Sequence, residues 1–383
     1  MRIGLVAAEP SGDQLAAGLM RRLVQLRPDA RFEGIGGKAM MAAGLESWAP
    51  MERLSVMGLV EVLGQLPGLL KLRGDLARRW RRNPPDLFIG VDAPDFNLGL
   101  ETLLKQQGVP TVHYVCPTVW AWRPRRVEKI RRAADLVLSI FPFEKAFLDR
   151  HGLGSAYVGH PMAADYPLQP DRAAARQALG LKADAPVLAL LPGSRRGEVQ
   201  RLAPPFLQAA RRCAESLPGL QVVTPLATEA TMQDYKRFCR RDGAGLDITL
   251  TLDNTRQALE AADVVLVASG TATFEALLCK RPMVVGYRLN PLTHGIIRGL
   301  NMLKIEHVAM ANLLSGEPLA DEYLQGRCTG ENLAQALLGL FRDPARRARI
   351  EAAYRQVHEG LVMDTNDLAA RAVLQLQEKS QHE

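Results

Sequence analysis

Short apolar runs alternate with amphipathic stretches along most of the chain. The first run, 2–8, is followed by a helical pattern from about Gln14 to Leu26, with Asp13 placed to cap it. Such alternation predicts parallel strands that are buried on both faces and connected by helices. The runs expected as strands in the first half are 2–8, 32–35, 87–91, 111–115, 136–140 and 156–158.

The composition changes around 163–172, where Pro167 and Pro170 stand among polar residues and predict a linker. The alternation then restarts, and from Thr329 onward only helical patterns remain. We therefore expect an α/β protein with two Rossmann-like domains facing across a cleft and a helical C-terminal tail. The expected boundaries are 1–165, 166–345 and 346–383. The runs expected as strands in the second half are 187–191, 221–224, 248–252, 264–268 and 283–285.

The stretch 263–275 combines a buried strand, a small-residue turn at Ser269, Gly270 and Thr271, and the start of a helix. Free backbone N–H groups at such a turn suit a phosphate. Glu275 follows one turn into the helix, where its carboxylate can accept two hydrogen bonds from a ribose diol. Together these features predict a nucleotide-diphosphate pocket. An ordinary β-α unit with Thr271 as the helix cap fits the stretch about equally well.

A second turn of this kind, Gly193-Ser194-Arg195, also lies between a buried run and a helical pattern. Arg195 adds a fork of donors that can neutralise a diphosphate leaving group. The alternative is that Arg195 and Arg196 are solvated surface charges. No G-x-G-x-x-G follows the first strand and no GxxxxGK[ST] occurs, so the signatures of dinucleotide oxidoreductases and P-loop enzymes are missing.

Acidic residues follow two of the expected strands in the first half. Asp92 comes directly after 87–91, and Pro94 is expected to hold Ala93 extended and so to fix the loop that carries Asp92 and Asp95. Glu9 occupies the corresponding position after the first strand. A carboxylate at that edge can act as a general base toward a hydroxyl group, although a single Asp in a loop is more often a capping residue.

Composition and charge limit the kinds of partner and the cellular compartment, but they do not identify a ligand. The 383 residues carry a net charge of +7, which allows nucleic acid, an anionic membrane or phosphorylated substrates as partners. Five scattered cysteines without a CxxC motif predict reduced thiols in a cytoplasmic protein, and the N-terminus does not read as a signal peptide. No D-x-D motif occurs, and His113 and His160 lack metal-ligand spacing, so no metal site is expected.

The segment 54–70 carries a single formal charge, at Glu61, and is interrupted by Gly58, Gly64, Pro67 and Gly68. This makes it a poor spanning helix and an awkward core helix. Six basic residues follow within 71–82, with Asp75 as the only acid. Apolar residues beside a basic cluster predict an interfacial segment that meets an anionic membrane surface. A buried helix pair with a solvated basic face is the alternative.

The motifs in their order resemble those of the lipid-A-disaccharide synthase family, from residue 2 to about 376. The motifs that carry the resemblance are Glu9-Pro-Ser-Gly-Asp13, Val56-Met-Gly-Leu-Val-Glu-Val-Leu-Gly64, Asp92-Ala-Pro-Asp-Phe-Asn97, His113-Tyr-Val, Val119-Trp-Ala-Trp122, Phe141-Pro-Phe-Glu144, Val158-Gly-His160, Leu191-Pro-Gly-Ser-Arg195, Ala268-Ser-Gly-Thr271, Val285-Gly-Tyr-Arg288 and Asn312-Leu-Leu.

The resemblance implies an inverting glycosyltransferase of the GT-B fold in lipid A biosynthesis. It would transfer 2,3-diacylglucosamine from its UDP derivative to the 6-hydroxyl of 2,3-diacylglucosamine 1-phosphate (lipid X), without a cofactor or metal. It would work in the cytoplasm, peripherally associated with the inner membrane. The helical tail also permits a homodimer that exchanges C-terminal segments.

The resemblance also distributes the candidate residues. Asp92 is the preferred base, ahead of Asp95, while Glu9 and Ser11 would line the sugar and acceptor side. The residues it implies on the UDP side are Gly193, Ser194, Arg195, Ser269, Gly270, Thr271, Glu275, Tyr287 and Asn312.

Two other classes of protein compete with this interpretation. A UDP-sugar epimerase can share the architecture, but it has no reason to carry an apolar surface for acyl chains. A nucleic-acid-binding protein would explain the charge, but no RNP-like or helix-turn-helix signature occurs, and no nucleic-acid partner is expected.

Overall fold

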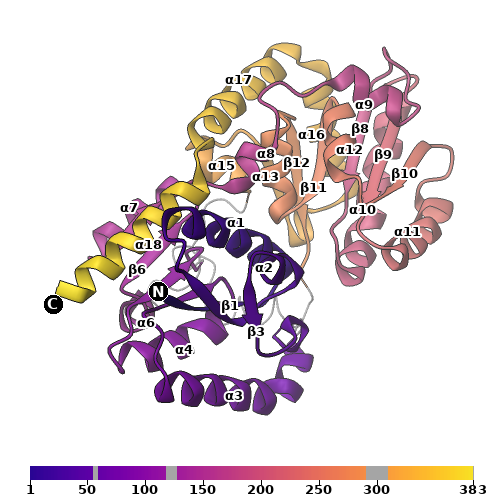
Figure 1. Cartoon of the computed structure of the whole chain (residues 1–383). Coiled ribbons are helices and arrows are strands. Elements are labelled where there is room, and N and C mark those ends of the chain that lie inside the picture. Colours follow the sequence, from indigo (N-terminus) through magenta and orange to yellow (C-terminus); the bar gives the residue numbers. More distant parts are fainter. Residues whose placement is uncertain (55–58, 118–126, 290–308, 383) are drawn as a thin grey trace. The chain divides into compact units, whose positions relative to one another are not determined.

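The computed structural model describes residues 1–54, 59–117, 127–289 and 309–382, without the side chains of 59–65, 381 and 382. The chain forms two compact units, each built on a parallel sheet (Figure 1). Unit 1 comprises Met1–Ala164 and Val362–Glu383, and unit 2 comprises Asp165–Leu361. Trp120 and Trp122 of the sequence motifs lie outside the described residues.

Unit 1 contains a seven-stranded sheet in the order β3-β2-β1-β4-β5-β6-β7, with every neighbouring pair parallel. Residues of β1 and β4 are buried almost throughout, which explains why these strands read as continuous apolar runs. The strands are β1 (Arg2–Ala7), β2 (Arg31–Ile35), β3 (Leu45–Ser47), β4 (Leu87–Val91), β5 (Thr111–Tyr114), β6 (Leu136–Ser139) and β7 (Ser155–Tyr157).

Helices cover both faces of this sheet, as right-handed crossovers require when the strand order reverses between β1 and β4. A core cluster joins α3 and α4 to the sheet around Trp80, whose ring lies 5.2 Å from that of Phe88. The helices of unit 1 are α1 (Pro10–Leu26), α2 (Lys38–Ala42), η1 (Met51–Arg53), α3 (Leu59–Arg82), α4 (Pro94–Lys105), α6 (Val127–Ala133), α7 (Pro142–Arg150), α8 (Pro161–Asp165, ending at the unit boundary) and α18 (Thr365–His382).

Asp13 does not cap the first helix. That helix begins at Pro10, and a proline in the first turn lacks only an N–H that would have no helical partner. Asp13 lies inside α1, and its carboxylate accepts hydrogen bonds from the backbone N–H groups of Gly37, Ala39 and Met40 at 2.8–3.0 Å. The side chain therefore caps α2 and ties it to α1.

Unit 2 contains a six-stranded sheet in the order β10-β9-β8-β11-β12-β13, again entirely parallel. The strands are β8 (Val187–Leu191), β9 (Gln221–Leu226), β10 (Asp247–Leu252), β11 (Val264–Ala268), β12 (Met283–Tyr287) and β13 (Asp321–Leu324). The helices are α9 (Arg172–Ala178), α10 (Arg196–Ser216), α11 (Glu229–Asp242), α12 (Thr255–Ala261), α13 (Thr271–Leu278), α15 (Met310–Ser315), η3 (Gln325–Arg327), α16 (Gly330–Arg342) and α17 (Pro344–Leu361).

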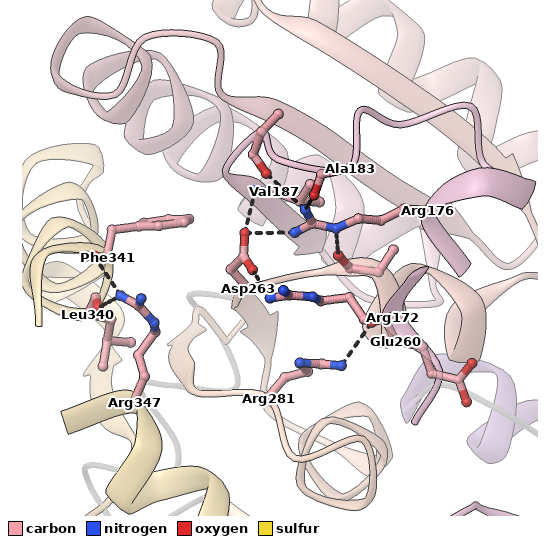
Figure 2. Close-up of polar contacts among 12 residues, drawn as sticks. Arg172, Arg176, Ala183, Val187, Glu260, Asp263, Arg281, Leu340, Phe341 and Arg347 are labelled. Atoms are coloured by element: carbon pink, nitrogen blue, oxygen red, sulfur yellow. Dashed lines mark hydrogen bonds and ion pairs between the residues drawn. The ribbon is translucent and has the colours of Figure 1, made fainter. Parts of the chain in front are cut away.

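A partly buried carboxylate anchors α9 to this sheet (Figure 2). Asp263, directly before β11, accepts hydrogen bonds from Arg172, Arg176 and the backbone N–H of Val187 at 2.8–2.9 Å. Arg176 is only 4% exposed and also donates to the carbonyl of Ala261 at 3.0 Å. Asp263 therefore has a structural role at the amino end of β11, on the side of the sheet opposite to the carboxyl ends of the strands.

The strandless C-terminal region forms α16, α17 and α18, with α17 in unit 2 and α18 in unit 1. Figure 1 shows α18 lying along α1. Arg22 on α1 pairs with Asp367 on α18, with Nε 2.8 Å from Oδ1. Gly18 leaves room for this approach, because a Cβ atom there would lie 2.4 Å from Asn366 Oδ1. The last helix thus belongs to the packing of the first domain.

The helix α3 is continuous through Pro67. Its C-terminal half is a core helix, with Leu72, Leu76 and Trp80 buried against the sheet. Leu66 and Leu70, one turn apart, are 42% and 47% exposed. Among the described residues, none of the helices combines the length and the apolar composition that a bilayer crossing needs.

Candidate active site

A cavity of about 340 Å³ lies in unit 2 at the carboxyl ends of β8 and β11, where the strand order reverses. Ligands of open α/β sheets bind at such switch points. All the donor-side residues expected from the sequence except Asn312 line it. The lining consists of Leu191, Gly193, Ser194, Arg195, Glu198, Pro225, Ala227, Thr255, Ala268, Ser269, Gly270, Thr271, Ala272, Glu275 and Tyr287.

The turn between β11 and α13 presents a helix N-terminus to the cavity. Gly270 has φ of +149°, a conformation that side-chain-bearing residues rarely adopt, and its carbonyl accepts hydrogen bonds from both Thr273 N and Thr273 Oγ1. This geometry aims the first turn of α13 at the cavity, where helix N–H groups and the helix dipole favour an anion.

The turn between β8 and α10 differs from the expected phosphate loop. The carboxylate of Glu198 accepts hydrogen bonds from the N–H groups of Ser194 and Arg195 at 3.2 and 3.4 Å. These two N–H groups, which were expected to bind a phosphate, therefore already have a partner within the chain. The guanidinium of Arg196 forms two hydrogen bonds with the carboxylate of Asp234, at 2.8 and 3.2 Å. The side chain of Arg195 lines the cavity and is the group of this turn best suited to an anion.

Glu275 lines the cavity from within α13 and accepts a hydrogen bond from the hydroxyl of Tyr166, with Oε1 2.8 Å from the phenolic oxygen. Burial raises the pKa of Glu275, and the hydrogen bond from Tyr166 opposes that rise. Tyr166 lies within the segment 163–172 that the composition predicts as a linker, and no local pattern indicates its contact with Glu275, because 109 residues separate the two partners.

Asn312 lies outside the cavity lining and is 1% exposed. Its amide donates to Ala320 O at 2.9 Å and to Glu322 Oε1 at 2.8 Å, and its carbonyl accepts from Ala320 N at 2.8 Å. The side chain thus joins α15 to the start of β13, which gives it a structural role in the donor unit.

The predicted acids of unit 1 also gather at a switch point. Strands β1 and β4 are neighbours with Ala7 opposite Val91, so Glu9 and Asp92 follow adjacent strand ends. The first turn of α1, which contains Ser11, packs on the same edge, since a Cβ atom at Gly12 would meet Val91 Cγ1 at 3.5 Å. Asp95 lies exposed in the first turn of α4.

The loop that carries Asp92 is not extended as expected. Asp92 and Ala93 both have left-handed backbone angles, with φ of +51° and +43°. The fully buried Asn97 explains how this turn is held: its side-chain amide donates to the Asp92 carbonyl at 2.8 Å and lies within 3.3 Å of the carbonyls of Val91 and Val6. The buried hydrogen bonds of the Asn97 amide, to Asp92 nearby and to Val6 in β1, therefore override the local preference that Pro94 imposes.

His113 and His160 of the sequence motifs are packed within the protein rather than grouped as metal ligands. His113 is fully buried, with Nδ1 2.7 Å from Glu101 Oε1. His160 packs at 5.2 Å from the ring of Phe141, and burial lowers its pKa to about 4. Within the described part of the chain, no three His, Cys, Asp or Glu side chains are grouped as metal ligands would be.

Solved structures share this fold at low sequence identity. A glycosyltransferase from Rickettsia africae aligns over 99% of this chain and 98% of its own, with a TM-score of 0.60 and 11% identity. A putative UDP-N-acetylglucosamine 2-epimerase from Listeria monocytogenes gives 0.62 at 13% identity over 97% and 94%. An Anabaena protein in complex with UDP and glucose gives 0.55 at 15% identity over both whole chains. The fold is that of GT-B glycosyltransferases.

Sequence comparison is more specific. The profile of the family described as Lipid-A-disaccharide synthetase matches residues 3–375. The lipid-A-disaccharide synthase of Sodalis glossinidius is 49% identical over 374 residues, which cover 98% of this chain and 97% of the relative. That of Alkalilimnicola ehrlichii is 50% identical over 376 residues, 98% of each chain. The chain therefore belongs to the lipid-A-disaccharide synthase family.

Proposed function

We propose that this enzyme transfers 2,3-diacylglucosamine from UDP-2,3-diacylglucosamine to the 6-hydroxyl of lipid X, giving a β-1,6-linked lipid A disaccharide 1-phosphate and UDP. The observation that carries the proposal is the family match over 3–375. The epimerase neighbour shares the fold at 13% identity, whereas the synthases share about half of their residues with this chain. Mass spectrometry of the acylated disaccharide product tests the reaction directly.

In this proposal the cavity of unit 2 binds the UDP part of the donor. The first turn of α13 and the Arg195 guanidinium meet the diphosphate, and Glu275 accepts the hydroxyl groups of the ribose. Tyr287, at the end of β12, closes the lining beside them. Arg195 then stabilises the negative charge that grows on the departing UDP.

Variants of two lining residues test these assignments. Arg195→Ala should weaken UDP binding and turnover together, because it removes a positive charge in both the ground state and the transition state. Glu275→Ala should weaken UDP while competition by free pyrophosphate stays unchanged. Unchanged UDP affinity in Glu275→Ala would make the ribose assignment wrong. Added EDTA should leave UDP release largely unaffected, since Arg195 and the helix end supply the positive charge.

The acids of unit 1 supply the base. The carboxylate of Asp92 accepts the proton of the acceptor 6-hydroxyl while that oxygen forms its bond to the anomeric carbon, and the bond to UDP breaks on the opposite side. Glu9 and Ser11, on the same sheet edge, line the sugar and acceptor side. Asp95 is the second choice for the base, because it stands one residue into α4 and is more exposed.

The N-terminal half of α3 is proposed as the membrane contact. Leu66 and Leu70 are exposed on one side of the helix, and the exposed Lys71, Arg81 and Arg82 follow them. Exposed leucines can enter the acyl region while cations meet anionic headgroups. Such peripheral contact with the cytoplasmic side of the inner membrane would bring the enzyme to substrates that carry acyl chains. Arg79 is partly engaged elsewhere, since its guanidinium lies 3.6 Å from the Trp48 ring.

A homodimer by exchange of α18 is a further part of the proposal. The α1–α18 contact through Arg22 and Asp367 can form within one chain or between two. Charge reversal tests it: Arg22→Asp and Asp367→Arg should each dimerise poorly, and mixing them should restore dimers by light scattering. Monomers in all samples, including the parent protein, would contradict the exchange.

A further inference from the structure

Three consecutive residues at the start of unit 2 are bound by the elements that build the nucleotide cavity. The carbonyl of Asp165 accepts a hydrogen bond from Arg256 Nη1 at 3.1 Å, and the carbonyl of Pro167 accepts one from Lys280 Nζ at 2.7 Å. Between them, the hydroxyl of Tyr166 donates to Glu275 Oε1 at 2.8 Å. A segment whose composition indicates a linker is therefore docked along α12 and α13.

Tyr166 is held on its ring as well as at its hydroxyl. The Arg256 guanidinium carbon lies 5.0 Å from the ring centroid, within the range of a cation–π contact. Arg256 is itself fixed by an ion pair with Glu260 at 2.9 Å. Burial raises the pKa of Tyr166 above its ordinary value, so the phenol keeps its proton at neutral pH and acts as a donor.

This contact leaves Glu275 able to serve a ligand. A carboxylate offers about four lone-pair sites, of which Tyr166 uses one and a ribose diol would use two. Glu275 lines the cavity while Tyr166 is not among the lining residues, so the tyrosine supports the carboxylate from outside. A glutamate side chain that a hydrogen bond already orders loses less conformational entropy on ligand binding than one that is free to move.

We propose that Tyr166 is a positioning residue for nucleotide recognition: its hydroxyl holds the Glu275 carboxylate in the orientation that accepts the ribose hydroxyls of a uridine nucleotide. This proposal rests on the proposed function, because it takes Glu275 as the ribose acceptor. It assigns to Tyr166 no contact with the sugar and no step in the chemistry. It predicts that removing one oxygen atom, away from the ligand, weakens ribose recognition.

The test compares UDP with 2′-deoxy-UDP, which lacks one hydroxyl of the diol. Isothermal titration on the full chain gives a Kd for each, and the ratio of the two values reports ribose recognition. The parent should prefer UDP by about tenfold or more, the scale of one hydrogen bond to a charged group. Tyr166→Phe should lower that ratio at least about threefold, mainly by weakening UDP, because the deoxy compound depends less on the carboxylate.

Two variants make the result specific. Tyr235→Phe removes another buried tyrosine hydroxyl of unit 2, which accepts a hydrogen bond from Thr224 at 3.4 Å, and it should keep the parent ratio. Glu275→Gln should lose most of the preference for UDP over 2′-deoxy-UDP if Glu275 binds the ribose. Equal weakening of both nucleotides in Tyr166→Phe would show a merely structural role and overturn the proposal.

The remaining outcomes distinguish the role of Tyr166 from the assignment of Glu275 to the ribose. A parent-like ratio in Tyr166→Phe, with the ratio lost in Glu275→Gln, would overturn the role of Tyr166 and leave the proposed donor site standing. A parent-like ratio in Glu275→Gln, or no preference for UDP in the parent, would overturn the ribose assignment itself and the role of Tyr166 with it.

Discussion

At the residue scale, the backbone beside the proposed base is under strain that one buried amide holds in place. Asp92 and Ala93 both occupy the left-handed region, which costs about 1–3 kcal/mol for each non-glycine residue. Asn97 offsets this cost by donating to the Asp92 carbonyl at 2.8 Å. Strain of this kind persists where a side chain must be presented at a fixed place, which favours Asp92 over Asp95 as the base.

The first prediction concerns that base. Asp92→Asn keeps the size of the side chain but removes the proton acceptor, so turnover should fall by a factor of about 10² or more while UDP affinity stays unchanged. Asp95→Asn, three residues away, is the matched control and should retain most of the activity. Rates from a UDP-release assay, with binding of UDP by titration, check both. Near-normal turnover in Asp92→Asn would move the role to Asp95 or Glu9.

The second prediction concerns Lys280, which follows α13 and is buried with Nζ 2.7 Å from His358 Nδ1. Burial, reinforced by the charges of Arg355 and Arg281 and opposed by Glu260 and Cys279, lowers its pKa to about 8. An unfolded lysine titrates near 10.4. Between about pH 8 and pH 10.4 the unfolded chain therefore binds more protons at this site, so Lys280 makes the folded state more stable as the pH rises.

The measurement is chemical denaturation of the parent and of Lys280→Met across this pH range. The free energy of unfolding of the parent minus that of the variant should increase by up to about 3 kcal/mol between pH 8 and 10.4. The subtraction removes the contribution of the buried tyrosines and of the cysteines distant from Lys280, because that contribution is the same in both proteins. A difference that does not change with pH would mean that the lysine titrates normally.

At the element scale, α9 offers two arginines on one carboxylate in contrasting surroundings. Both bond Asp263, but the side chain of Arg172 is 52% exposed and that of Arg176 only 4%. Arg176→Met removes a buried partner from the partly buried Asp263 carboxylate and the donor to the Ala261 carbonyl, so it should destabilise unit 2 by about 2–4 kcal/mol. Arg172→Met removes a solvent-screened pair and should cost under about 1 kcal/mol. Equal losses in denaturant titrations would contradict the anchor shown in Figure 2.

A second element-scale prediction concerns α3. Replacing Leu66 and Leu70 with Gln keeps helix propensity but removes the exposed apolar side chains, so sedimentation with anionic vesicles and activity on the lipid substrates should both fall. UDP affinity and melting temperature should stay unchanged. Leu103→Gln, an exposed leucine on α4 at 38%, is the control. Vesicle binding equal to the parent's would place the contact elsewhere. Val60 and Leu63 of the same segment lie outside the described side chains.

Apolar periodicity predicted the strands that are buried and both switch-point turns of unit 2, because a buried parallel strand is a local apolar run in the sequence. It missed the short edge strands β3 and β13, most of whose residues are not fully buried. The failures are tertiary. Asp13 caps a helix more than 20 residues away. The backbone at Ala93 departs from the extended form expected before Pro94, because Asn97 bonds to Val6 in β1 as well as to Asp92. Tyr166 meets Glu275 across 109 residues, beyond any local pattern. The capping role of Glu198 could have been predicted from the sequence, since a glutamate three residues after an N-cap position is a known capping signal.

At the scale of the whole molecule, each unit holds its candidate residues at the switch point of its own sheet. Unit 2 provides a cavity with a helix N-terminus, a cation and a carboxylate, and unit 1 provides acids at neighbouring strand ends. This division matches the needs of a transfer between two substrates, since the nucleotide and the attacking hydroxyl require opposite kinds of groups. An epimerase acting on one substrate would not require an acceptor.

The decisive measurement is whether UDP release depends on the acceptor lipid X. The purified protein is given UDP-2,3-diacylglucosamine with and without lipid X, and UDP and the lipid products are quantified together. We predict UDP release that requires lipid X and equals the amount of disaccharide 1-phosphate formed. UDP release or sugar isomerisation at the same rate without lipid X, and no disaccharide with it, would contradict assignment of this chain as the transferase.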